Sequence, residues 1–191
     1  MNFLAMTPPT ILGLDPGTRF LGAAVLRGSE LLAYGVHTLR NGERPYDLIG
    51  EARRIVLGYI ERHGPQVVAI EAPYMIATKR AAVLSTVAQE LHERSKELGI
   101  EVVELSPERA RVVVTGNAKA TKYEVAQQLA AEGFPELKSL VPKKPTTPAL
   151  WLTSKERYWL HVFDALVLAE AVAQGIREAE IRVGRADVRG A

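Results

Sequence analysis

An acidic residue at the end of an apolar run is the feature that most constrains this chain. Asp15 follows the apolar residues 11–14 and precedes Pro16 and Gly17. A charged carboxylate that ends a buried strand costs several kcal/mol unless it has a partner. Pro16 lacks a backbone donor and Gly17 permits a tight turn, so a regular strand must end here. Asp15 therefore either caps its own turn or reaches out of a sheet toward a cation or a phosphate.

Two further acids stand in similarly apolar surroundings. Glu71 ends residues 65–70, which have the pattern of a buried strand. Asp164 lies in an apolar, helix-like segment, and His161 precedes it by three positions, so the two share a helix face. Two carboxylates at strand ends and a helical His-x-x-Asp pair predict an oxygen-rich site for hard cations such as Mg²⁺.

Length and composition limit the class of protein. The 191 residues predict one domain with a substantial core. The chain has no cysteine, which excludes a disulfide scaffold and a cysteine-based zinc site. We find no signal peptide and no apolar run of membrane-spanning length, so we expect a cytoplasmic protein without a membrane partner.

The distribution of charge says more than the net charge of +2. Basic residues cluster in the second half of the chain, where they suit phosphate contacts or a solvated surface. The clustered residues are Arg109, Arg111, Lys119, Lys122, Lys138, Lys143, Lys144, Arg177, Arg182, Arg185 and Arg189.

The apolar periodicity predicts an α/β fold with a central five-stranded mixed sheet and helices on both faces. Strands are expected at residues 11–15, 20–26, 31–39, 65–71 and 100–105, and helices at 45–62, 79–98, 107–114, 118–132 and 154–180. A short disordered lead is expected at 1–10, one domain at 11–180 and a basic tail at 181–191. Residues 134–153 hold four prolines and show no periodicity, which predicts a long loop or insertion.

The order of these motifs resembles the RuvC family of Holliday-junction resolvases, in the RNase H-like superfamily. The similarity rests on Asp15-Pro16-Gly17-Thr18 with Gly22, on the setting of Glu71, on the basic residues 107–122 and on the final His-x-x-Asp helix. It covers residues 11–174 and implies a metal-dependent endonuclease that cuts four-way or other branched DNA in recombination and repair.

The resemblance also assigns roles to residues. Asp15, Glu71 and Asp164 would be the metal-binding carboxylates, and His161, where many relatives have Asp, would complete the catalytic set. The metal would be two Mg²⁺ ions, for which Mn²⁺ can substitute, with Asp15 bridging both. His161 would ligate an ion, position the attacking water or relay its proton. The expected DNA contacts are Tyr74, which would stack on bases, and the basic residues Arg111, Lys119 and Lys122.

The resemblance further implies a homodimer through the helix at about residues 79–98. Two departures from the family stand out: the insertion at 134–153, and Arg111 in place of the commoner Lys. The insertion leaves the nuclease chemistry intact and puts junction specificity in question.

Three other interpretations remain at this point. A YqgF-like nuclease of the same superfamily would act on RNA precursors. An actin-like ATPase also opens with an Asp-x-Gly-Thr loop, but it needs a second loop and a second lobe, which this chain lacks. A non-catalytic branched-DNA-binding protein would have no need for a complete acidic set that repels DNA.

Overall fold

A five-stranded mixed sheet forms the centre of the computed structural model, which describes residues 7–39, 45–72, 79–142 and 154–189. The strand order is β3-β2-β1-β4-β5. The strand directions confirm the predicted mixed sheet. The three N-terminal strands form an antiparallel meander, and β4 and β5 add in parallel beside β1. The strands are β1 (Thr10–Pro16), β2 (Phe20–Arg27), β3 (Glu30–Thr38), β4 (Val67–Glu71) and β5 (Glu101–Leu105).

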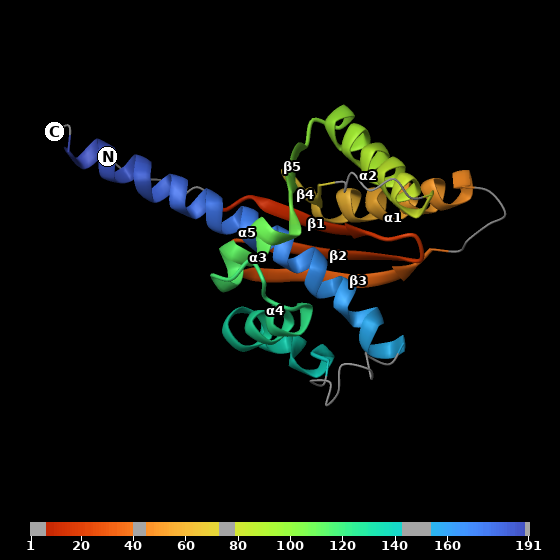
Figure 1. Cartoon of the computed structure of the whole chain (residues 1–191). Coiled ribbons are helices and arrows are strands. Elements are labelled where there is room, and N and C mark those ends of the chain that lie inside the picture. The colour runs from red at the N-terminus through yellow and green to blue at the C-terminus, as the bar shows by residue number, and fades with distance from the viewer. Residues whose placement is uncertain (1–6, 40–44, 73–78, 143–153, 190–191) are drawn as a thin grey trace.

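Helices cover both faces of the sheet (Figure 1). One face carries α1 (Pro45–His63) and α2 (Lys79–Glu97). The other carries α3 (Pro107–Thr115), α4 (Lys122–Gln128) and the long α5 (Ser154–Arg189). Ser106 accepts a hydrogen bond from the Arg109 amide and Pro107 begins α3, so this helix starts where its capping sequence predicts.

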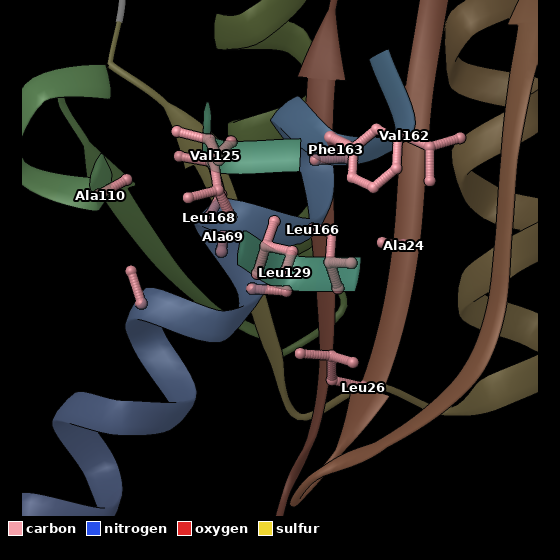
Figure 2. Close-up of a cluster of buried hydrophobic side chains, with 14 of the residues drawn as sticks. Ala24, Leu26, Ala69, Ala110, Val125, Leu129, Val162, Phe163, Leu166 and Leu168 are labelled. Carbon is pink, nitrogen blue, oxygen red and sulfur yellow. The ribbon is translucent and has the colours of Figure 1, made fainter. Parts of the chain in front are cut away.

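Alternation along the strands divides the core into two layers. In β1, Leu12 and Leu14 face α1 and α2, while Ile11 belongs to the cluster on the α5 side. Figure 2 shows part of this second cluster, where Phe163 and Leu166 of α5 pack near Ala24 and Leu26 of β2. Each strand thus contributes side chains to both layers, and the sheet is buried on both faces.

The α5 face differs in how closely its helix approaches the sheet. Gly13 of β1 and Gly22 of β2 lie beneath α5, and a Cβ atom at either would fall about 2 Å from a helix carbonyl oxygen. The oxygen nearest Gly13 belongs to Ala165 and the one nearest Gly22 to His161. These two glycines let the backbone of α5 rest on the sheet, which fixes the height of His161 and its neighbours.

The segment at residues 134–153, predicted as a long loop or insertion, contains helical turns in its described part. Its described part, up to Pro142, contains a 3₁₀ helix at Pro135–Leu140, preceded by a π-helical turn at Leu129–Gly133. Phe134 and Leu137 are buried in the core on the α5 side. The sequence did not indicate these turns because π and 3₁₀ turns do not carry the apolar period of an α-helix. Residues 143–153 lie outside the described part.

Helix α5 is longer than predicted, since it runs to Arg189 instead of ending near Glu180. The expected basic tail begins inside this helix, and residues 181–189 hold no proline that would stop it. Among the described residues, Tyr158–Ile176 is long and apolar enough to span a membrane by composition, which the sequence reading overlooked. Because 61% of this stretch is buried and it packs across β1 and β2, it has the character of a core helix.

Candidate active site

Asp15 and His161 form the centre of the site. Asp15 lies at the end of β1 and is only 9% exposed. Its Oδ2 lies 2.5 Å from Nδ1 of His161, on the first described turns of α5. An ionised carboxylate has no proton to give, so Nδ1–H of His161 donates to it. The ring of Phe20 lies tilted against the imidazole at 5.5 Å between centroids and holds it from a second side.

Asp164 lies one turn further along α5, on the same helix face as His161. One ligand atom from each of Asp15, His161 and Asp164 can be chosen so that all lie within 4.8 Å of one another. Burial raises the pKa of Asp164, and the negative charge of Asp15 raises it further, against the opposing effect of Lys122. Helix α5 therefore places a second carboxylate near that of Asp15, and Lys122 offsets only part of the effect that burial and Asp15 have on Asp164.

Lys122 supplies a cation to this cluster. It is the first residue of α4, where Thr121 and Glu124 form a capping box that fixes the start of the helix. Its Nζ donates to Oδ2 of Asp164. Burial alone would lower the pKa of Lys122, but the carboxylates of Asp164, Asp15 and Glu71 together outweigh it and raise the pKa. Lys122 is therefore charged within the site.

Glu71 stands at the end of β4, beside but outside the cluster of three ligands. A hollow of about 140 Å³ is lined by Glu71, Arg111, Lys122 and Asp164 together with apolar residues of α3, α4 and α5. Burial raises the pKa of Glu71 to about 7, with further contributions from the charges of Asp15 and Asp164. Lys122 and Arg111 oppose this rise without cancelling the combined effect of burial and the two neighbouring carboxylates.

The predicted site residues thus separate into three groups. Asp15, His161 and Asp164 converge, and Glu71, Arg111 and Lys122 border the adjoining hollow. Lys119 lies on the exposed turn before α4, where its amide bonds the Asn117 side chain, and it does not line that hollow. Tyr74 lies outside the described residues, so its stacking role stays a prediction.

The sequence analysis missed the residues that position the site residues without being candidate ligands themselves. Gly13 and Gly22 allow the close approach of α5, and Phe20 supports the His161 ring. Phe20 and Gly22 lie within the Asp-Pro-Gly-Thr neighbourhood that carried the prediction. Gly13 and Gly22 lie on the same face of the β1–β2 hairpin. Two glycines placed in this way can indicate that a helix contacts both strands.

A sequence profile of the family described as Crossover junction endodeoxyribonuclease RuvC matches residues 11–132. This match covers more than half of the chain and includes Asp15, Glu71, Arg111 and Lys122. The chain belongs to the RuvC family. His161 and Asp164 lie beyond the matched range, so the fold rather than the profile relates them to the other residues.

Individual relatives agree with this assignment. A crossover junction endodeoxyribonuclease RuvC of Bacteroides fragilis is 32% identical over 130 residues, which cover 62% of this chain and 66% of that protein. The aligned part thus spans slightly less than two thirds of that relative.

Solved structures show the same fold. The Thermus thermophilus RuvC in complex with Holliday junction substrate superposes with a TM-score of 0.67 at 24% identity, covering 89% of this chain and 96% of that chain. The yeast mitochondrial Holliday junction resolvase Ydc2 has a TM-score of 0.59 at 15% identity, covering 88% of this chain and 80% of that chain. At these identities the likeness establishes the RNase H-like fold, which the sequence analysis predicted.

The donor set fits a divalent metal ion. Carboxylate oxygens and an imidazole nitrogen converge within 4.8 Å. Burial first and neighbouring negative charge second raise the pKa values of Asp164 and Glu71. Hard cations such as Mg²⁺ and Mn²⁺ take such oxygen ligands and would relieve this repulsion. Asp15 and Asp164 would hold such an ion through their carboxylate oxygens.

Proposed function

We propose that this protein is a divalent-metal-dependent endonuclease that resolves four-way DNA junctions by paired, symmetric nicks. The observation that carries the proposal is the convergence of Asp15, His161 and Asp164 beneath the close-packed α5 of a RuvC-family fold. The relatives that match the chain are named for crossover junction cleavage, and the Thermus structure holds a junction.

In this proposal Asp15 has two tasks. One carboxylate oxygen accepts from Nδ1–H of His161, which leaves the other for a metal ion. When His161 is neutral, its Nε2 carries the lone pair and can take a proton from the attacking water. Bound divalent ions would lower the pKa of that water and neutralise charge on the departing 3′ oxygen.

Lys122 and Arg111 act on the scissile phosphate. The Lys122 ammonium contacts Asp164, and Arg111 borders the same hollow, so both cations stand where negative charge would build up. Fixed positive charge at that place stabilises the transition state more than the ground state. The flexible stem of Lys122 would let its ammonium contact a phosphate oxygen of bound DNA.

The proposal includes the assembly that symmetric cutting requires. Two active sites are needed for paired nicks, and we propose a homodimer through α2, with Tyr74 stacking on bases near the junction centre. We propose Mg²⁺ as the metal, two ions per site, with Mn²⁺ as a functional substitute, and the cytoplasm as the compartment.

A panel of substrates tests this function. The purified protein is incubated with a labelled synthetic four-way junction, a linear duplex of the same sequence and a structured RNA, each with Mg²⁺ or with EDTA. We expect paired nicks confined to the junction and only with Mg²⁺. Cutting of the RNA alone would favour the YqgF-like alternative, and junction binding without any metal-dependent cutting would favour a non-catalytic binder.

A further inference from the structure

A second hollow lies on the opposite face of the sheet from the candidate active site. It has a volume of about 410 Å³ and opens between β3 and α1. We call it the β3–α1 hollow and define it by His37, Glu51, Arg54, Gly58, Tyr59 and Arg62. This volume is within the range of sites that hold small ligands or parts of larger ones.

The hollow is lined by polar and cationic groups. Nε2 of His37 lies 3.0 Å from the hydroxyl of Tyr59, and this pair forms a polar wall. Arg54 and Arg62 also line the hollow, and the Arg54 side chain is 75% exposed. Among the described residues that line the hollow, Glu51 is the one acid, and its Oε1 lies 4.0 Å from a guanidinium nitrogen of Arg54. Two arginines against one carboxylate leave an excess of positive charge.

Glycines keep this space open. Gly58 lies in the middle of α1 and lines the hollow, and a Cβ there would meet nothing within 4 Å. A glycine inside a helix costs about 1 kcal/mol relative to alanine, and no close packing on the sheet requires it here. Gly35 of β3 makes room for the polar wall, because its Cβ would come within 2.8 Å of the Tyr59 hydroxyl.

The strand register places the hollow at the same end of the sheet as the active site. Pro16 pairs with Leu21, and Leu21 pairs with His37, so His37 shares a row with the residue next to Asp15. Two inter-strand spacings separate the ends of that row, about 10 Å. The row of Asp15 faces α5 and the row of His37 faces α1. Asp15 and His37 both lie near the C-terminal ends of their strands, so DNA that crosses this end of the sheet can contact both places.

From this arrangement we infer that the β3–α1 hollow binds a phosphate group, supplied by the backbone of the DNA held at the candidate active site. The inference rests on the proposed function. Two arginines that line one hollow can offer guanidinium forks to phosphate oxygens, and exposed arginines contribute to DNA affinity through counterion release. A free phosphorylated small molecule would use the same chemistry.

The test removes the two charges and measures binding. Arg54→Gln/Arg62→Gln is made in an Asp15→Asn background, and binding of a four-way junction is measured at several salt concentrations. We expect weaker binding and a slope of log K against log[salt] that is less steep by about 0.9 for each lost contact. The control, Arg53→Gln, removes a charge from the same helix; Arg53 pairs with Glu90 and does not line the hollow.

Two single changes give opposite signs. Glu51→Gln removes the negative charge from the lining and should tighten junction binding. Gly58→Leu fills the hollow while it keeps both arginines, and it should weaken binding as the double arginine variant does. With Asp15 intact, single-turnover cleavage at saturating DNA should remain at the wild-type rate in all four variants, because none touches the candidate active site.

A parallel arm identifies the source of the phosphate. Sodium pyrophosphate is titrated without DNA, and thermal stabilisation is compared between wild type and the Arg54/Arg62 variant. Stabilisation that needs the arginines, with unchanged junction binding, would assign the hollow to a free phosphorylated ligand and overturn the DNA source. Wild-type behaviour of the variant in both arms would overturn the phosphate site. Failure of the wild type to bind a junction would instead contradict the proposed function.

Discussion

The two faces of the sheet hold their helices in different ways. On the α1 and α2 face, side chains such as Leu12, Leu14 and Leu21 separate the helices from the strands. On the α5 face, Gly13 and Gly22 let the helix backbone touch the sheet. Side-chain packing adapts to small changes, whereas backbone contact does not. The face that must place His161 and Asp164 against Asp15 is therefore the one with the least freedom.

The largest expected effect is a loss of cleavage when Asp15, on the α5 face, is changed. Asp15→Asn removes a metal ligand and the anionic partner of His161, so cleavage of the junction should fall by at least about 10²–10³-fold. Single-turnover cleavage and a binding assay measure the two effects separately, and junction binding should persist because the basic surface is intact. Asp47→Asn, at an exposed position of α1, is the control and should cleave normally. Equal loss of binding and cleavage would exclude a metal-ligand role for Asp15.

The next effect tests the backbone contact itself. A Cβ at Gly22 would lie 2.0 Å from the carbonyl oxygen of His161, so Gly22→Ala should destabilise the protein by about 1–3 kcal/mol and slow cleavage by displacing α5. Gly50→Ala is the matched control: Gly50 lies in α1, where a Cβ meets nothing within 4 Å, and the change should stabilise by up to about 1 kcal/mol. Chemical denaturation measures both, and equal effects would remove the distinction between the faces.

A smaller effect separates the cations of the site from those around it. Lys122→Ala should slow the chemical step by about 10–100-fold, less than loss of Asp15, because Arg111 still borders the hollow. Lys119→Ala should leave the single-turnover rate at saturating DNA unchanged, since Lys119 does not line that hollow. An unchanged rate in Lys122→Ala would show that Lys122 takes no part in the chemical step.

The smallest effect is one of stability. The pKa of Glu71 rises from 4.5 to about 7 on folding, so its ionised form opposes folding fully above about pH 7 and not at all below pH 4.5. In EDTA at pH 8, Glu71→Gln should therefore raise the melting temperature, by about 2–4 °C for each kcal/mol relieved. The gain should shrink as the pH falls toward 4.5, and Glu61→Gln on exposed α1 surface should show none. A lower melting temperature at pH 8 would contradict the crowding of negative charge.

Much of the fold could be predicted because strand alternation, capping residues and strand-end acids are local signals. Ser106, Pro107 and the acids at Asp15 and Glu71 fall where their sequence context indicates. The π and 3₁₀ turns that bury Phe134 and Leu137 could not be read, because they break the α-helical period.

The geometry of the site was less accessible from the sequence. The contacts of Gly13 and Gly22 depend on which helix crosses the sheet, and the pairing of Lys122 with Asp164 joins residues 42 positions apart. The raised pKa of Glu71 likewise arises from burial by the packed elements and from the charges of Asp15 and Asp164 on other elements. A sequence pattern names candidate ligands, while their mutual distances come from the packing of α5.

Direct measurement of metal binding tests the central claim, that the α5 face holds a divalent-metal centre. Mn²⁺ is titrated calorimetrically into wild type, Asp15→Asn and the control Asp47→Asn, all without DNA. We expect Mn²⁺ binding in wild type and the control, and markedly weaker binding or a lost ion in Asp15→Asn. Identical affinity and stoichiometry in wild type and Asp15→Asn would place the metal elsewhere and contradict the account.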